Sequence, residues 1–230
     1  MHINNCFKRN LYFCTDNYQM NFLGHIFLSG EEDEIILGNF IADHVKGKIQ
    51  NEYPQRVIKG IQLHRAIDYF TDHHPIVIQG VRRLNVDYGH YGTVIIDMYY
   101  DHFLSSLWTD YHHERIVSYT QNIYARLMPY LETMPARTQS MLPYMVRDNW
   151  LAGYARADGL ARALNGMAKR AKFVSGMENA TAYLLNNYEV FKEEFRAFMP
   201  DVIVYADEWK NQNKIISPEE IYDNKKTRDK

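Results

Sequence analysis

The sequence has few cysteines, and both of them, Cys6 and Cys14, lie at the start of the 230-residue chain. They do not form the CxxC pair that is typical of a metal or redox motif. The sequence does not decide whether the two form a disulfide. The remainder of the chain has no cysteine, which is typical of a protein from a reducing compartment. We therefore expect a cytoplasmic location.

Long apolar runs and an excess of positive charge are also absent. No run approaches the roughly 18 residues that span a bilayer, and residues 1–19 lack the apolar segment of a signal peptide. The formal net charge is −2, whereas nucleic-acid-binding domains are typically basic. We expect no membrane and no nucleic-acid partner, and the oligomeric state stays open.

The sequence contains no segment with the apolar–polar alternation of strands between hairpin turns, and no internal repeat. Apolar residues, which make up 46% of the chain, recur instead at helical spacing. Pro75 fits the first turn of a new helix, and Pro129 is expected to kink the helix around it. The other expected helices cover residues 33–47, 55–72, 93–108, 114–134, 138–151, 156–170 and 178–198. The prediction is an all-α protein with a single helical domain.

The two ends of the chain differ in composition from its middle. Residues 1–19 are polar and irregular, and a different texture begins at Met20 with MNFLGHIFLSG. We interpret residues 1–19 as a leader that precedes the true start at Met20. Residues 206–230 are charged and poor in apolar side chains, so we expect a mobile tail. The helical domain is therefore predicted to cover residues 20–205.

Three of the expected helices carry polar stripes. Side chains four residues apart lie on one face of a helix, and the stretch QLHRAIDYFTD (62–72) places a histidine and two carboxylates at this spacing. Apolar neighbours indicate that each stripe interrupts a face that packs on the core. The stripes are Asn39 with Asp43; His64 with Asp68 and Asp72; and Asp97 with Asp101, beside His102.

A divalent metal is the simplest explanation of these stripes. An ionised carboxylate costs several kcal/mol to bury unless it is paired or bound to a cation, and several Asp side chains on core-forming helices would repel one another. Ligation by Asp and His without Cys suits Mn²⁺, Mg²⁺, Fe²⁺ or Zn²⁺. Helical bundles build such sites from inward side chains on facing helices.

Each residue also has an ordinary structural interpretation. Any one of these carboxylates can cap a helix or pair with an arginine, and Asp97 is a candidate for such a pair. Asp72 lies in TDHHP, where turn chemistry explains it equally well. His25 lies in the apolar segment FLGHIFL and is either a core histidine or a further ligand.

Five segments resemble the acyl carrier protein phosphodiesterase family, also called ACP hydrolase, which is regarded as a divergent relative of the HD-type metal phosphohydrolases. In chain order they are MNFLGH (20–25), LGNFIADHVKG (37–47), GIQLHRAIDYFTD (60–72), YDHFLSSLW (100–108) and LNGMAKR (164–170). The resemblance covers essentially residues 20–200. It implies an HD-like helical bundle and the family's reaction.

That reaction is the hydrolysis of the phosphodiester that joins 4′-phosphopantetheine to a serine of holo-acyl carrier protein, which leaves apo-carrier. The resemblance therefore implies a phosphoric diester hydrolase of fatty acid and lipid metabolism. It also implies a divalent metal, typically Mn²⁺. The carrier protein is the partner that we expect.

The chain departs from the family pattern at three positions. Phe27 stands where the family commonly has a second histidine after His25, Gln62 stands where it commonly has the first of two histidines, of which His64 remains, and Ala66 stands where it often has an arginine. The adjacent His-Asp doublet that names the HD group is absent, so His64 and Asp68 would supply those groups from successive turns.

Our hypothesis assigns each residue a role. The metal ligands are expected to be Asp43, His64, Asp68 and Asp101, with His25 a further candidate; His102 is the candidate for protonating the leaving serine. Asn39, Asp72 and Asp97 would orient the ligands. A basic surface would attract the acidic carrier and its phosphate, and the candidate side chains are Arg65, Arg82, Arg83, Lys169, Arg170 and Lys172.

Two other functions stay open at this point. One is an HD-type phosphohydrolase that uses the same metal cluster on a nucleotide or another small phosphodiester. The other is a non-enzymatic all-α binding protein, in which the stripes are buried polar networks that hold no metal.

Overall fold

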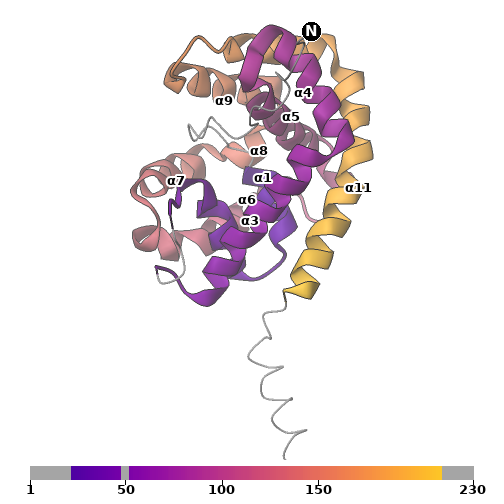
Figure 1. Cartoon of the computed structure of the whole chain (residues 1–230). Coiled ribbons are helices and arrows are strands. Elements are labelled where there is room, and N and C mark those ends of the chain that lie inside the picture. Colours follow the sequence, from indigo (N-terminus) through magenta and orange to yellow (C-terminus); the bar gives the residue numbers. More distant parts are fainter. Residues whose placement is uncertain (1–21, 48–51, 214–230) are drawn as a thin grey trace, which may run out of the picture.

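The computed structural model describes residues 22–47 and 52–213. Within these residues the chain is helical and has no strand, which confirms the all-α prediction (Figure 1). The α-helices are α1 Phe22–Ser29, α2 Asp33–Ile41, α3 Gln55–His73, α4 Pro75–Tyr88, α5 Gly92–Ser106, α6 Ile116–Leu127, α7 Ala136–Asp148, α8 Trp150–Gly153, α9 Ala157–Arg170, α10 Ala180–Asn186 and α11 Tyr188–Gln212. Short 3-10 helices are η1 Ala42–His44, η2 Gly89–Tyr91, η3 Trp108–Asp110, η4 Met128–Thr133 and η5 Met177–Asn179.

Several boundaries of the observed helices differ from the expected ones. Pro75 is the first residue of α4, as predicted. Pro129 does not kink a continuous helix: α6 ends at Leu127 and the chain continues as η4. Because proline lacks the N–H that continues an α-helix, the tighter 3-10 turn takes over. The helix expected over 178–198 is divided at Asn187 into α10 and α11.

The long helix α11 runs along one side of the molecule and packs on α3, α4 and α5 (Figure 1). It continues to Gln212, beyond the expected end of the domain at residue 205, and Ala206 is fully buried. Residues 206–212 are therefore part of the helical body. The expected leader of residues 1–19 with Cys6 and Cys14, the expected start at Met20, and the end of the expected tail lie outside the described residues.

The part of the core that adjoins the polar stripes lies between α1, α3, α5 and α11. Leu23 of α1, Ile61 of α3 and Phe103 of α5 are fully buried there, and Phe103 packs against Phe195 of α11 with a ring-centroid distance of 5.8 Å. The polar stripes of α3 and α5 are thus carried by helices whose other side chains make the core, and the stripe of Asn39 and Asp43 lies on α2 and η1. No helix among residues 22–47 and 52–213 has both the length and the apolar composition to cross a bilayer.

Two glycines let α2 and α3 cross at backbone contact. A Cβ on Gly38 would lie 2.0 Å from the Val57 carbonyl oxygen, and a Cβ on Gly60 would lie 2.3 Å from that of Ile35. Atoms cannot approach so closely, so a larger residue at either position would force the helices apart. The crossing places Asn39, the residue after Gly38, directly against α3.

Candidate active site

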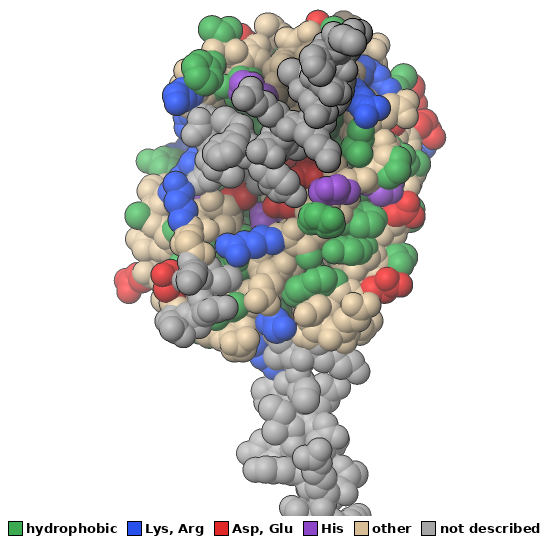
Figure 2. Space-filling view, in the orientation of Figure 1, with side chains coloured by type: hydrophobic (Ala, Val, Ile, Leu, Met, Phe, Trp, Pro, Cys, Tyr) green, Lys and Arg blue, Asp and Glu red, His purple; other side chains and the backbone are tan. Residues whose placement is uncertain are grey.

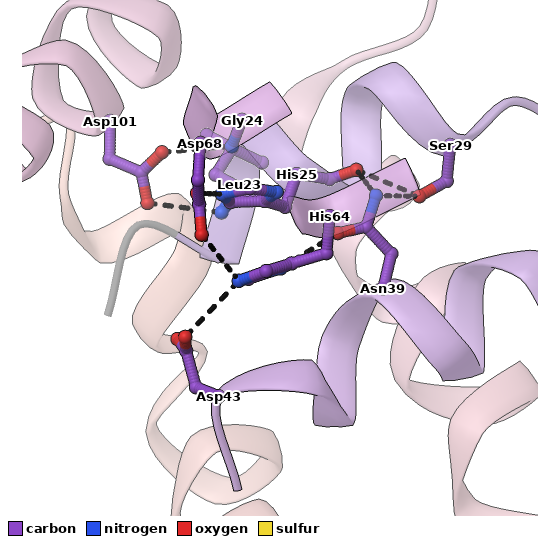
Figure 3. Close-up of polar contacts among 9 residues, drawn as sticks. All are labelled: Leu23, Gly24, His25, Ser29, Asn39, Asp43, His64, Asp68 and Asp101. Atoms are coloured by element: carbon purple, nitrogen blue, oxygen red, sulfur yellow. Dashed lines mark hydrogen bonds and ion pairs between the residues drawn. The ribbon is translucent and has the colours of Figure 1, made fainter. Parts of the chain in front are cut away.

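Two histidines and two carboxylates from three elements meet in one cluster (Figure 3). The rings of His25 on α1 and His64 on α3 are stacked, with centroids 3.9 Å apart. Asp68 reaches both rings: its Oδ1 lies 3.1 Å from His25 Nε2 and its Oδ2 lies 3.2 Å from His64 Nε2. Asp43 of η1 places Oδ1 3.1 Å from the same His64 nitrogen.

The local sequence explains why these side chains converge. His64 and Asp68 are four residues apart on α3 and therefore point the same way, as the spacing predicted. Asp43 arrives because α2 tightens into η1 after Ile41, which turns the chain back towards α3. His25 arrives because α1 packs beside α2 and α3.

The carboxylates and the second ring set the charge of each histidine. Burial tends to lower the pKa of His64, but Asp68 and Asp43 outweigh it and raise this pKa to about 10. Burial and the neighbouring His64 lower the pKa of His25. Burial tends to raise the pKa of Asp68, and the two histidines outweigh it and hold the pKa well below its ordinary value. The two rings together therefore carry three ring N–H protons and one positive charge.

The cluster fits a divalent metal. His25, His64 and Asp68 each offer a ligand atom, and these atoms lie within 4.8 Å of one another. Both ring nitrogens of His25 are buried and lack a hydrogen bond among the described residues, although Nε2 faces Asp68 at ion-pair distance. A buried nitrogen aimed at a carboxylate without a hydrogen bond is well placed to ligate a cation. The donors are imidazole and carboxylate, a set that suits Mn²⁺, Fe²⁺ or Zn²⁺.

Asp101 does not make the contacts expected of a metal ligand. Its Oδ2 accepts the Leu23 N–H (3.0 Å) and its Oδ1 accepts the Gly24 N–H (2.8 Å), so both oxygens bind the first turn of α1 (Figure 3). Burial raises the pKa of Asp101 to about 7, against the effect of the two N–H donors. In this arrangement Asp101 anchors the helix that carries His25.

The other two predicted carboxylates lie beside the cluster. Asp97 lines a pocket together with His25 and Asp101. Burial, followed by the charges of Asp68 and Asp72, raises the pKa of Asp97 well above its ordinary value. Burial and Asp68 also raise the pKa of Asp72. No ion pair to an arginine forms at Asp97 within the described part of the chain, so the ordinary interpretation offered for it is not supported.

His102 is not placed to act as the general acid. Its Nδ1–H donates to the Tyr154 carbonyl (2.7 Å), and its Nε2 accepts from the Tyr188 hydroxyl (3.1 Å). Burial lowers its pKa, in spite of the bond to Tyr154. Both nitrogens are used by neutral groups, so His102 is a satisfied core histidine.

The candidate cations differ in availability. Arg83 makes a two-pronged bond to Glu194 and stacks over Phe191, so it is already engaged. Arg65, Arg82, Lys169, Arg170 and Lys172 are exposed. Figure 2 shows one face of the molecule, on which acidic and histidine side chains gather near the middle, with Lys and Arg side chains spaced around them. Arg65 lies on α3, next to His64 in sequence.

Two polar residues escaped the sequence reasoning. Ser29, at the end of α1, donates to the His25 carbonyl and accepts from Asn39. Its position four residues after His25 is the same spacing that marked the other stripes, so the signal was present. His44 bonds through Nδ1 to the Thr138 hydroxyl at 2.7 Å, a contact across 94 residues that no local pattern indicates.

Fold and cluster together define an all-α protein with a buried His/Asp site suited to a divalent cation. The sequence model of the acyl carrier protein phosphodiesterase family matches residues 20–202, and the chain belongs to that family. No solved structure matches it.

Relatives described as acyl carrier protein phosphodiesterases are similar over most of their length. One from Yersinia pestis is 31% identical over 188 residues, which cover 81% of this chain and 97% of the relative. One from Photorhabdus laumondii is 31% identical over 194 residues, covering 82% and 96%. One from Salmonella agona is 31% identical over 191 residues, covering 81% and 97%. The residues matched by the family model, 20–202, include the whole candidate site.

Proposed function

We propose that this protein hydrolyses the phosphodiester between 4′-phosphopantetheine and the serine of holo-acyl carrier protein, at a divalent cation held by His25, Asp43, His64 and Asp68. The observation that carries the proposal is the stacked pair of buried histidines bridged by Asp68, in a chain of the acyl carrier protein phosphodiesterase family. We place this activity in the cytoplasm, and we expect Mn²⁺ to be the preferred ion.

A bound divalent cation supplies positive charge that polarises a phosphoryl oxygen and activates water for attack. The protein supplies the geometry. Asp68 holds both rings in one orientation, and Asp43 fixes His64 from the other side. Asp101 anchors α1 and with it His25, because it binds the first amides of that helix.

Asp97 is the better candidate for the proton that the leaving serine needs. When the P–O bond breaks, the serine oxygen takes the electron pair and must gain a proton. Burial and the neighbouring carboxylates raise the pKa of Asp97 well above its ordinary value, which favours its protonated form, and its side chain lines the pocket beside His25. A protonated carboxyl can donate there, whereas both nitrogens of His102 are already bonded.

Arg65 is the exposed cation on the helix that carries His64 and Asp68. We propose that it contacts the phosphate or an acidic side chain of the carrier. Lys169, Arg170, Lys172 and Arg82 would act at longer range through charge. Arg83 has no such role in this proposal, because Glu194 already pairs with it.

The direct test is to incubate the protein with holo-acyl carrier protein and Mn²⁺ and to weigh the carrier by mass spectrometry. We expect the wild type to remove the phosphopantetheine mass and Asp43→Ala not to do so. The matched control is Asp158→Ala, which removes an exposed aspartate that pairs with Arg156 and Arg162 far along the chain. An unchanged carrier with wild-type protein that binds Mn²⁺ would contradict the carrier as substrate and favour a small phosphodiester. An unchanged carrier without Mn²⁺ binding would contradict the enzyme.

A further inference from the structure

A chain of buried hydrogen bonds runs behind the metal cluster from the end of α1 to His64 (Figure 3). The Ser29 hydroxyl donates to the His25 carbonyl oxygen at 2.8 Å. The Asn39 Nδ2 group donates to that same carbonyl at 3.0 Å and to Ser29 Oγ at 2.8 Å. Asn39 Oδ1 then faces His64 Nδ1 at 3.0 Å.

The donors and acceptors in this hydrogen-bond network fix the orientation of the Asn39 side-chain amide. A hydroxyl has one proton, and Ser29 gives its proton to the His25 carbonyl, so Ser29 Oγ can only accept from Asn39. The carbonyl likewise can only accept. Both neighbours therefore need the N–H side of the amide, and a flipped amide would place its oxygen against two oxygens.

The orientation of the Asn39 amide determines which nitrogen of His64 is free to bind a metal. An amide oxygen accepts and cannot donate, so His64 Nδ1 must carry a proton. Nε2 is then the nitrogen that faces Asp43 and Asp68 and that can offer a lone pair to a cation. A hydrogen bond at one ring nitrogen commonly sets which of the two binds metal.

We propose that Ser29 is a positioning residue, which acts through Asn39 to hold His64 in the form that binds the metal through Nε2. The inference rests on the proposed metal site. It adds Ser29, which is not a metal ligand, and it gives the donor and acceptor of each hydrogen bond between Ser29 and His64. Ser29 does not touch the ligand nitrogens. Its effect passes through one amide, and its burial, with 3% of its surface exposed, limits replacement by water.

Ser105 offers a matched control. It is also a serine with 3% of its surface exposed, and its hydroxyl also donates to backbone carbonyls, those of Leu151 (3.2 Å) and Ala152 (3.4 Å). Ser105→Ala and Ser29→Ala thus remove the same group from comparable surroundings. Only Ser29 is bonded to Asn39.

The experiment measures two properties of wild type, Ser29→Ala and Ser105→Ala. The first, on metal-free protein, is the exchange protection of the His64 Nδ1–H in ¹⁵N-edited NMR. The second is the affinity for Mn²⁺ alone by calorimetry. For Ser29→Ala we expect faster exchange of this proton and about tenfold weaker Mn²⁺ binding, within the range typical of outer partners of metal ligands. Ser105→Ala should resemble wild type in both, whatever it loses in thermal stability.

The outcomes separate this inference from the proposed function. Equal Mn²⁺ affinity and equal proton protection in Ser29→Ala and Ser105→Ala would overturn the positioning role while the metal site stands. Attachment of Zn²⁺ to His64 Nδ1 in the NMR spectrum of loaded wild type would overturn it as well. A wild type with a protected Nδ1–H that takes up no Mn²⁺ would instead overturn the proposed metal site, and the positioning role with it.

Discussion

His64 and His102 are equally buried, each with 4% of its surface exposed, yet their pKa values move in opposite directions. His64 faces an amide oxygen with one nitrogen and two carboxylates with the other, and its pKa rises to about 10. His102 faces a carbonyl and a phenol, and its pKa falls. Burial alone therefore does not mark a functional histidine. The charge of its partners distinguishes the two, because carboxylates beside the ring stabilise a proton or a metal cation there, whereas a carbonyl and a phenol do so less.

The largest effect is expected from a substitution that disrupts the cluster around His64. Asp68→Asn removes the carboxylate that bridges both rings, so Mn²⁺ affinity and carrier hydrolysis should each fall by more than the ~100-fold that an outer partner can cost. Calorimetry and mass spectrometry measure the two. His102→Gln is the comparison: it should keep both properties and lose only stability. Equal loss of activity in the two variants would remove the distinction between these histidines.

The next effect is the pH dependence of metal binding. His64 must release its Nε2 proton before that nitrogen can ligate, and its pKa of about 10 means that this proton is present throughout the neutral range. Mn²⁺ affinity should rise about tenfold per pH unit between roughly pH 6.5 and 8.5. Calorimetry in buffers of different ionisation enthalpy also counts the released proton. An affinity that does not change with pH would contradict a charged His64.

The metal-free protein should show the same charge through its stability. The folded-state pKa of His64 lies above the ordinary value of 6.5, so its contribution is fully present below pH 6.5 and is lost as the pH rises through about 10. Over this window the free energy of unfolding should fall by about 1.4 kcal/mol per pH unit. Denaturant unfolding with a chelator present measures it. His64→Asn should flatten the slope, and a slope that persists in that variant must come from another group.

The smallest effect concerns the partner of His102. Tyr188→Phe deletes the hydroxyl that donates to His102 Nε2 and leaves a buried acceptor without its bond, at a cost of about 1–3 kcal/mol. Thermal unfolding should detect this, while Mn²⁺ affinity stays as in wild type. The exposed Tyr144→Phe serves as control for the substitution itself. A change in metal affinity would mean that the two histidines are coupled.

The local parts of the site could be predicted from the sequence, and the long-range parts could not. His64 and Asp68 share a face because the helix repeat dictates it, and the structure brings them together as expected. Asp101 carried the same spacing with Asp97, and His102 stood beside it. The partners of Asp101 are nevertheless Leu23 and Gly24, and those of His102 are Tyr154 and Tyr188. Those contacts depend on how helices pack, which a stripe on one helix does not specify.

The same limit applies to the fold. Helical periodicity gave the class and most of the helices, and Pro75 gave a true beginning. The end of α11 could not be read from composition, because residues 206–212 look charged while Ala206 packs into the core. A charged segment is helical when one of its faces has a buried surface to meet, and that surface is made by other helices.

The crossing of α2 and α3 has a consequence for anyone who would transplant this site. Gly38 and Gly60 let the two backbones touch, and the distance between Asn39 and His64 follows from that contact. A recipient helical bundle that received only the histidines and aspartates would keep its own wider spacing, and the amide would fall short of the ring. The unit to transfer is therefore the crossed pair α2 and α3 with Gly38 and Gly60, together with the ligands that these helices carry.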